Sequence, residues 1–439
     1  MLTWLFTKTP LSFLTQPFWR DEAFTYLMAK KNVLEIIFLT AKDFNPPLYY
    51  LILHFWMKIF GSTEIALRSL SVIFFWATTY VAFLFLNDIF KFKLKRSFFY
   101  LIFFIINPLL LYYAFEARMY SMFAFLASLS YFSFYKKNYR LYLFSTIAGL
   151  FTHYFMLLVV FSQLFFLIIN KENVENFKKT YIYSSLAVFS PWLVFFFSQN
   201  GLPGSFWLPK PNLQYIFGFF GILYTGIEFK SYSDIITRRL TNNVAYTSIV
   251  LFLIVAIGIY FYFKSFTKKD RINFQLFFIW GVGISLIIGL ISFIKPLYFP
   301  RYLIFTTFGF LLLIIFILEK INIYLRTILI VILIILTFSY QKLQLEYRKK
   351  TDLRKVLREI QVISNKKDLL YTNDLDFFTA QYYFDKNRIY IYGKSYKEIP
   401  VYNGKVLIPK ENIASTLPLY PQKAFILNSN GQYAIQAMY

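Results

Sequence analysis

Cysteine is absent from the 439-residue sequence, and histidine occurs only twice. Without cysteine, the chain can form neither a disulfide nor a thiolate metal site. No histidine cluster has the spacing of a tight metal site either, so we expect no metal and no cofactor. A weakly bound divalent cation stays compatible with the sequence. Charged residues are also scarce, at 15% of the chain, which is low for an ordinary soluble domain.

Apolar residues make up 58% of the sequence. They gather in repeated runs of about 20 residues, the length that a helix needs to cross a hydrocarbon core, and they show no strand-like alternation. The sequence therefore predicts an all-α polytopic membrane protein with about 10 to 11 transmembrane helices. The clearest expected spans are residues 65–86, 98–113, 119–135, 181–197, 244–263, 272–294, 302–318 and 323–340.

The net charge of +24 would indicate a nucleic-acid partner in a soluble protein. Here the basic residues cluster in every second connection between the expected spans, which makes those connections cytoplasmic by the positive-inside rule. We therefore expect a multi-pass protein of the cell inner or plasma membrane, with membrane lipids and no nucleic acid as partners. The basic clusters lie within residues 91–96, 136–140, 171–179, 264–271 and 320–326.

Two stretches test this scheme. Residues 141–169 have basic clusters at both ends, so we interpret them as two short helices that turn outside the membrane at residues 152–154. Residues 2–14 are too few to span the membrane and are interrupted by Lys8 and Pro10. Either a first helix is truncated there, or the N-terminus begins outside. Residues 15–64 and 198–242 are expected to lie along the membrane interface.

The composition becomes polar after residue 340. A helix-like stretch at residues 352–363 precedes short strand candidates, which predicts a small C-terminal α/β domain that the number of spans places on the extracytoplasmic side. The chain is thus divided into a membrane domain, residues 1–340, and an extracytoplasmic domain, residues 341–439. The strand candidates are residues 369–372, 388–392, 405–408, 424–427 and 433–438.

Adjacent carboxylates stand out in the first outward segment. Asp21 and Glu22 precede an amphipathic stretch, so they would lie at a helix N-terminus, where a carboxylate can accept a proton from an incoming hydroxyl group. The structural alternative is that Asp21 only caps the helix. An interfacial arginine is more often ion-paired or snorkelling than a ligand, and a lone histidine beside aromatic residues is usually structural. The other polar candidates in outward connections are Asn45, Glu116, Arg118, His153 and Arg301.

Five short strings fall on the predicted outer face of the protein. They are FWRDEAF at residues 18–24, NPPLYY at 45–50, EARMY at 116–120, THYF at 152–155 and PRYL at 300–303. Together they resemble bacterial membrane glycosyltransferases of the GT-C superfamily, and within it the protein O-mannosyltransferases and the lipid A aminoarabinose transferases. The likeness runs in order over roughly residues 15 to 320, and the polar tail is similar to the extracytoplasmic domains that often close such chains.

The resemblance implies a hexosyl- or pentosyltransferase that takes sugar from a polyprenyl-phosphate donor. The acceptor would be a hydroxyl group of a protein, a lipid or a glycan. By this likeness Asp21 is the catalytic base with Glu22 beside it, while Arg118, Arg301 and Tyr302 lie at the donor phosphate. Glu116 and His153 are further site candidates, as is Asn45, which stands where relatives commonly carry His or Lys.

Two other classes of function compete with a transferase. A polyprenyl-lipid or small-solute transporter or flippase would usually place ionisable residues near the bilayer midplane, and the expected spans hold almost none. A noncatalytic scaffold that displays the C-terminal domain would make Asp21 dispensable. The sugar, the acceptor, the anomeric outcome and the oligomeric state stay open at this point.

Overall fold

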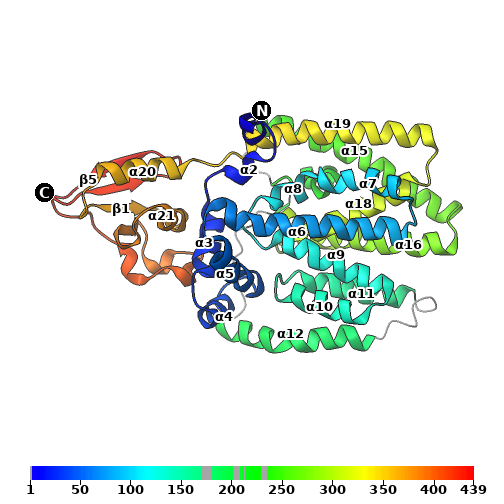
Figure 1. Cartoon of the computed structure of the whole chain (residues 1–439), viewed down its shortest axis with the longest axis horizontal. Coiled ribbons are helices and arrows are strands. Elements are labelled where there is room, and N and C mark those ends of the chain that lie inside the picture. The colour runs from blue at the N-terminus through cyan, green and yellow to red at the C-terminus, as the bar shows by residue number, and fades with distance from the viewer. Residues whose placement is uncertain (1, 171–178, 201–207, 209, 212, 229–234) are drawn as a thin grey trace.

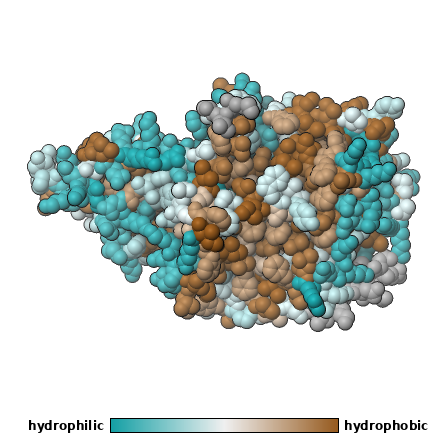
Figure 2. Space-filling view, in the orientation of Figure 1, coloured by the Kyte–Doolittle hydropathy of each residue, from teal (hydrophilic) through white to brown (hydrophobic). Residues whose placement is uncertain are grey.

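A computed structural model describes residues 2–170, 179–200, 208, 210–211, 213–228 and 235–439. A bundle of long helices makes up most of the molecule, and a smaller mixed region projects from one end of it (Figure 1). On the face shown in Figure 2, a broad apolar band covers the bundle and lies between hydrophilic surfaces at its two ends. This is the surface that a polytopic membrane protein presents to lipid.

Six helical segments among the described residues are long and apolar enough to cross a membrane, or seven if one bent pair is counted. The sequence led us to expect about 10 to 11. The difference arises because several helices in the expected spans are shorter than 18 residues, among them α9 (Tyr120–Lys136), α10 (Tyr139–Leu150) and α11 (Met156–Ile169). The first three segments are Glu64–Ile89, which begins with α6 (Glu64–Leu84), Tyr181–Ser198 in α12 (Lys179–Asn200), and α15 (Ile235–Lys264). The fourth, Lys268–Ile291, consists of α16 (Lys268–Phe278), a π-helical turn and α17 (Ile284–Ile291). The last two are Pro300–Leu318, which contains α18 (Ile304–Leu318), and α19 (Ile323–Tyr347).

The expected span at residues 98–113 is a bent pair of helices, which is either one broken span or a re-entrant loop, so that span stays a prediction. It consists of α7 (Leu94–Ile105) and α8 (Pro108–Ala114), which meet at an angle of 71°. Asn107 causes the break, because its side chain caps α8 by accepting from the backbone N–H groups of Leu109 and Leu110, at 3.1 and 3.0 Å. Pro108 follows at the first helical position, where it needs no hydrogen-bond partner for a backbone N–H.

Four of the five basic connections gather at one end of the bundle, where ion pairs join them, and the fifth, residues 171–179, lies almost wholly outside the described residues. Arg96 pairs with Glu319 at 2.5 Å, and Lys320 pairs with Asp270 at 2.7 Å. The expected short hairpin is also confirmed, since α10 and α11 meet at a turn around His153. The basic connections lie at the end of the bundle opposite the C-terminal region (Figure 1). The alternation of basic and non-basic connections along the sequence therefore matches the two ends of the bundle.

Short helices cover the end of the bundle nearest the C-terminal region. On α4, Leu34 and Phe38 are 67% and 56% exposed, which fits an amphipathic helix at a membrane interface. Gly226, which ends α14, has a φ of +66°, a conformation that glycine adopts without strain. The short helices are α1 (Leu2–Lys8), α2 (Ser12–Thr15), α3 (Arg20–Ala29), α4 (Val33–Ala41), α5 (Leu48–Phe60), α13 (Leu213–Phe217) and α14 (Phe219–Thr225).

The C-terminal region is a small α/β unit, as expected. Its five-stranded sheet has the order β3-β2-β1-β4-β5, and all neighbours are parallel except β4 and β5. The expected strand at residues 405–408 is wrong, because Lys405–Leu407 forms a 3₁₀ turn after the left-handed Gly404. The elements are α20 (Leu353–Ile363), β1 (Leu369–Thr372), α21 (Phe377–Tyr383), β2 (Ile389–Tyr392), β3 (Ile413–Ala414), β4 (Ala424–Leu427) and β5 (Tyr433–Gln436).

This unit packs directly on the membrane part. Ala23, Phe24 and Met28 of α3 share one hydrophobic core with Leu357 of α20 and Phe378 of α21. α19 also continues to Tyr347, beyond the expected end of the last span at residue 340. The division of the chain into residues 1–340 and 341–439 stays a prediction, and the contacts across it bring the segment after α19 to the candidate site.

Candidate functional site

Three consecutive charged residues open helix α3 and point to different partners. The N-cap of α3 is Trp19, whose side chain makes no capping bond, so Asp21 lies inside the first turn. Arg20 reaches Asp376 of the C-terminal region at 2.9 Å, Asp21 reaches Arg301 at 3.1 Å, and Glu22 reaches Arg68 at 2.8 Å. Their different surroundings follow from the helical geometry, which separates neighbouring side chains by about 100°.

Asp21 combines a cationic partner with access to solvent. Its side chain is 41% exposed, and its Oδ2 accepts from Nη1 of Arg301. Its backbone carbonyl accepts from Nη1 of Arg118 at 3.3 Å. The carboxylate therefore has free acceptor capacity on a surface that a ligand can reach.

Arg301 belongs to a row of alternating charges. Its Nε and Nη2 donate to the two carboxylate oxygens of Glu228 at 3.1 and 3.2 Å, while Nη1 donates to Asp21. Glu228 in turn accepts from Nη1 of Arg348 at 3.3 Å and from the Tyr113 hydroxyl at 2.7 Å. We call Arg348, Glu228, Arg301 and Asp21 the open row, because it ends at the exposed carboxylate. Burial would raise the pKa of Glu228, but the two arginines outweigh it and lower that pKa, so Glu228 is charged.

Arg118 is buried beside Asp21 with spare donor capacity. It is 6% exposed, and its Nη1 donates to the Thr25 hydroxyl at 2.9 Å as well as to the Asp21 carbonyl. Its Nε has no hydrogen-bond partner among the described residues. An unpaired donor on a buried guanidinium is costly unless a ligand satisfies it, so Arg118 suits an anion.

Glu22 lies at the centre of a second row of charges, which is closed to solvent. It is 0% exposed, and it accepts from Nε and Nη2 of Arg68, both at 2.8 Å, and from Nζ of Lys350 at 2.8 Å. The backbone N–H of Ala117 adds a fourth bond at 3.0 Å. Burial would raise the pKa of Glu22, but the two cations outweigh it and lower the pKa to about 2.

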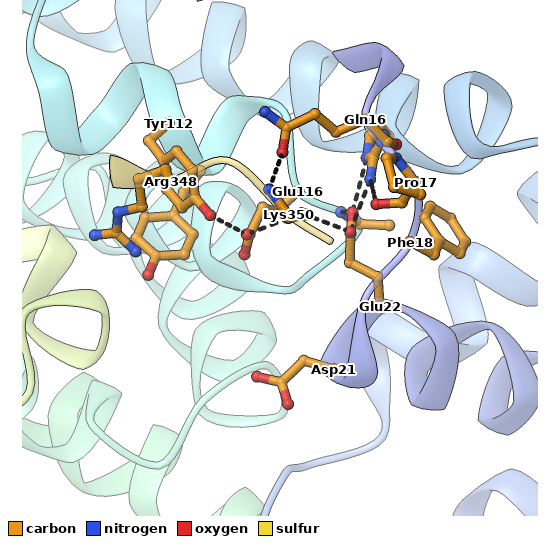
Figure 3. Close-up of polar contacts among 12 residues, drawn as sticks. Gln16, Pro17, Phe18, Asp21, Glu22, Tyr112, Glu116, Arg348 and Lys350 are labelled. Atoms are coloured by element: carbon orange, nitrogen blue, oxygen red, sulfur yellow. Dashed lines mark hydrogen bonds and ion pairs between the residues drawn. The ribbon is translucent and has the colours of Figure 1, made fainter. Parts of the chain in front are cut away.

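Glu116 completes this closed row, which we define as Arg68, Glu22, Lys350 and Glu116. It is 1% exposed and accepts from the Tyr112 hydroxyl at 2.6 Å, and it lies 3.4 Å from Nζ of Lys350. Figure 3 shows these contacts as one continuous group, with the carboxylate of Asp21 apart from them. Because both oxygens of Glu22 and Oε1 of Glu116 are bound within the protein, these side chains are arranged to fix the first turn of α3 and the α8–α9 loop.

His153 and Tyr302 lie together in an aromatic wall. The His153 ring stacks on Phe123 with centroids 4.7 Å apart, and its Nδ1 accepts from the backbone N–H of Phe155 at 3.1 Å. Burial, followed by the charge of Arg118, lowers the pKa of His153 to about 3, so the ring is neutral. Tyr302 lies 5.5 Å from His153 and 6.3 Å from Tyr120, measured between ring centroids. These rings border the side of the site that the arginines occupy.

Asn45 faces a carboxyl group that the sequence did not single out. Its Nδ2 donates to Oδ2 of Asp43 at 3.5 Å, a long contact. Burial raises the pKa of Asp43 to about 6, although the Phe44 backbone and Arg118 oppose the shift. A carboxyl group with a perturbed pKa beside candidate site residues is itself a candidate.

Sequence reasoning missed five charged residues of this region. Asp43, next to the NPP string, offered a signal because it is an acidic residue in the first outward segment. The other four gave none, since they lie far along the chain from Asp21 or inside an apolar span. Among the described residues, no group of three His, Cys, Asp or Glu side chains could hold a metal ion. The missed residues are Asp43, Arg68, Glu228, Arg348 and Lys350.

Comparison with solved structures finds a full-length likeness. ArnT from Cupriavidus metallidurans in the apo state superposes with a TM-score of 0.60 at 8% sequence identity, over 97% of this chain and 91% of that chain. The same protein bound to undecaprenyl phosphate gives a TM-score of 0.57 at 8% identity, over 97% and 90%. No protein-family profile matches the sequence, and no curated protein matches it. The chain therefore has the fold of ArnT, a lipid A aminoarabinose transferase and GT-C enzyme, as the five strings predicted.

Proposed function

We propose that this protein is a membrane glycosyltransferase that moves a sugar from a polyprenyl-phosphate donor to a hydroxyl acceptor, with Asp21 as general base. One observation carries the proposal: Asp21 contacts two buried cations, Arg301 through its half-exposed carboxylate and Arg118 through its backbone carbonyl. A base and a phosphate-binding pair are the two parts that such a transfer needs at one place.

Two further observations support a lipid-linked donor. One of the two solved structures compared above holds undecaprenyl phosphate. In addition, this chain has an apolar cavity of about 530 Å³, which includes Tyr298, shortly before Arg301 in the sequence. A polyprenyl chain would find a matching surface there, because it can bury apolar area without polar contacts. The cavity is lined by Tyr215, Phe219, Phe220, Phe252, Leu290 and Tyr298, among others.

The proposed chemistry needs one proton acceptor and one site of positive charge. Asp21 accepts the proton of the acceptor hydroxyl as its oxygen attacks the anomeric carbon of the sugar. The bond between that carbon and the phosphate oxygen breaks, and the electron pair leaves with the polyprenyl phosphate. Arg301 and Arg118 stabilise the charge that grows on this phosphate, so no metal is assigned. Because Arg301 already pairs with Asp21, the phosphate would compete for the same guanidinium.

We place the site on the extracytoplasmic side. The support is the gathering of basic connections at the opposite end of the bundle, joined by pairs such as Lys136 with Asp88 at 3.2 Å. Reporter fusions after Arg96, Lys137 and Lys320 should all report cytoplasm, and a fusion after Tyr340 should report the outside. A cytoplasmic signal after Tyr340 would move the site and the C-terminal region to the other face.

A release assay tests the proposed function. Purified protein is incubated with a panel of polyprenyl-phosphate sugars and candidate acceptors, and free polyprenyl phosphate is measured. We expect release with at least one donor, lost in Asp21→Asn. Arg118→Gln should weaken donor use by roughly 1.5 to 3 kcal/mol, the worth of a charge-assisted contact. Movement of the lipid across vesicles without release from any donor would favour a flippase instead.

A further inference from the structure

Arg348 lies outside the helices, just after α19 and before the C-terminal region, yet it forms the inner end of the open row. It is 7% exposed, and its Nη1 donates to Oε2 of Glu228 at 3.3 Å. Its Nη2 donates to the carbonyl oxygen of Gly226 at 3.0 Å, and its guanidinium lies over the Tyr112 ring at 4.2 Å. Arg348 therefore binds both a backbone carbonyl and the carboxylate of residues 226–228, the segment that also contacts Arg301.

The geometry of Arg301 depends on that segment. Two of the three guanidinium nitrogens of Arg301, Nε and Nη2, donate to Glu228, and the third, Nη1, donates to Asp21. The Tyr347 hydroxyl also donates to the Glu228 backbone carbonyl, at 2.7 Å. A flexible arginine side chain otherwise loses rotamer entropy when a ligand orders it. Contacts that order it beforehand reduce this cost.

The charges along the row have a consequence for an anionic ligand. Arg348, Glu228 and Arg301 together carry one net positive charge, which balances the negative charge of Asp21 at the end of the row. Without Arg348, the open row would carry one net negative charge. A net negative charge repels a phosphate, most strongly in a site of low dielectric, so Arg348 makes the row compatible with an anionic ligand.

We propose that Arg348 is a positioning residue for the donor phosphate, acting through Glu228 on Arg301. This inference rests on the proposed transferase function and deepens it. It makes the segment between α19 and the C-terminal region part of the phosphate site, although Arg348 itself touches no reacting atom. Phosphate recognition then depends on how the end of the last membrane helix is held.

The test uses a double-mutant cycle on the full-length protein. Binding of polyprenyl phosphate and the KM for the donor are measured for Arg348→Gln, Arg301→Gln and the double variant, together with melting temperatures. We expect Arg348→Gln to weaken binding about tenfold, which corresponds to about 1.4 kcal/mol. In the Arg301→Gln background the same change should have no further effect, because the arginine through which it acts is absent. Arg348→Lys keeps the charge and should restore most of the affinity.

Arg354→Gln is the matched control. Arg354 also joins the C-terminal region to the membrane part, through Glu64 at 3.0 Å, but it makes no contact with the open row. It should leave binding and KM unchanged. Additive losses in the double variant, or a lower melting temperature with unchanged affinity in Arg348→Gln, would overturn the positioning role. If the unmodified protein neither binds polyprenyl phosphate nor releases it from any donor, the transferase function fails first and this inference falls with it.

Discussion

The open row and the closed row contain the same numbers of carboxylates and cations, and they differ in the exposure of their terminal carboxylate. Each has two carboxylates and two cations, and each receives one cation from the segment after α19, Arg348 in one and Lys350 in the other. The closed row ends at Glu116, which is 1% exposed. The open row ends at Asp21, whose side chain is 41% exposed. Charge alone therefore does not distinguish a structural carboxylate from one that can meet a substrate, whereas access does.

Asp21 and Glu22 show this difference within one helical turn. Glu22 has four hydrogen-bond donors and no exposed surface, so an acceptor hydroxyl could reach it only if the fold opened. Asp21 has one side-chain partner, Arg301, and an open side. Experiments can therefore separate the two residues: substitution of Glu22 should mainly lower stability, and substitution of Asp21 should mainly lower the rate.

The largest expected effect is on stability, from Glu22→Gln. The substitution removes the negative charge that compensates Arg68 and Lys350, and breaking a buried ion pair typically costs about 3 to 5 kcal/mol. We expect a marked fall in the melting temperature of the purified protein. An unchanged melting temperature combined with a large loss of rate would reverse the assignment and return Glu22 to the catalytic site.

Asp21→Asn should do the opposite. Asparagine keeps the size of the side chain but cannot accept a proton, so turnover at saturating donor should fall by about 100-fold or more, or about 2.7 kcal/mol in the barrier. The melting temperature should hold, because the side chain is partly exposed and its ion pair with Arg301 is partly solvated. A normal rate would exclude Asp21 as the base.

Much of the fold could be predicted because membrane spans leave a strong signal in one sequence. Runs of apolar residues and alternating basic loops gave most of the spans and the hairpin around His153. The break at Asn107 was readable in principle, since an Asn-Pro pair is a helix-start signal even inside an apolar run. The strand expected at residues 405–408 failed because a short apolar run fits a strand and a partly buried turn equally well.

Two of the four members of each charge row could be predicted from the sequence. Asp21, Arg118 and Arg301 came from short strings on one face, and the structure brings them together. Glu228 was missed because it is one acidic residue in a long connection, and Arg348 because it belongs to a basic run after the last span. Only the tertiary fold places the Arg348–Glu228 pair beside Arg301. Pairings between residues so distant in sequence leave no periodic pattern to read.

Asp43 gives a smaller, pH-dependent effect near the open row. Burial raises its pKa to about 6, above the roughly 3.9 of an unfolded chain. The folded protein thus holds this proton more tightly, so this contribution to stability is full below about pH 4 and is lost as pH rises through about 6. Asp43→Asn should remove this pH dependence of stability. The melting temperature of the variant, relative to that of the unmodified protein, should therefore rise from pH 4 to 7. Parallel curves for the two proteins would contradict the shift.

The smallest expected effect is from Arg20→Gln, which tests the third charged residue of the same turn. Arg20 pairs with Asp376, but its side chain is 33% exposed. Asp376 also keeps Asn373, at 2.9 Å, and the Ser429 hydroxyl as partners. A partly exposed ion pair is worth about 0.2 to 1 kcal/mol, so the melting temperature should change by only a few degrees.

The rate of Arg20→Gln is the more informative measurement. If access to substrate separates Asp21 from its neighbours, the rate should stay within about twofold of the unmodified protein, since Arg20 faces the C-terminal region rather than Arg301. A loss of rate as large as that of Asp21→Asn, with stability intact, would show that the C-terminal region holds the first turn of α3 in its working position. In that case the two rows would not act independently of the contact between Arg20 and Asp376.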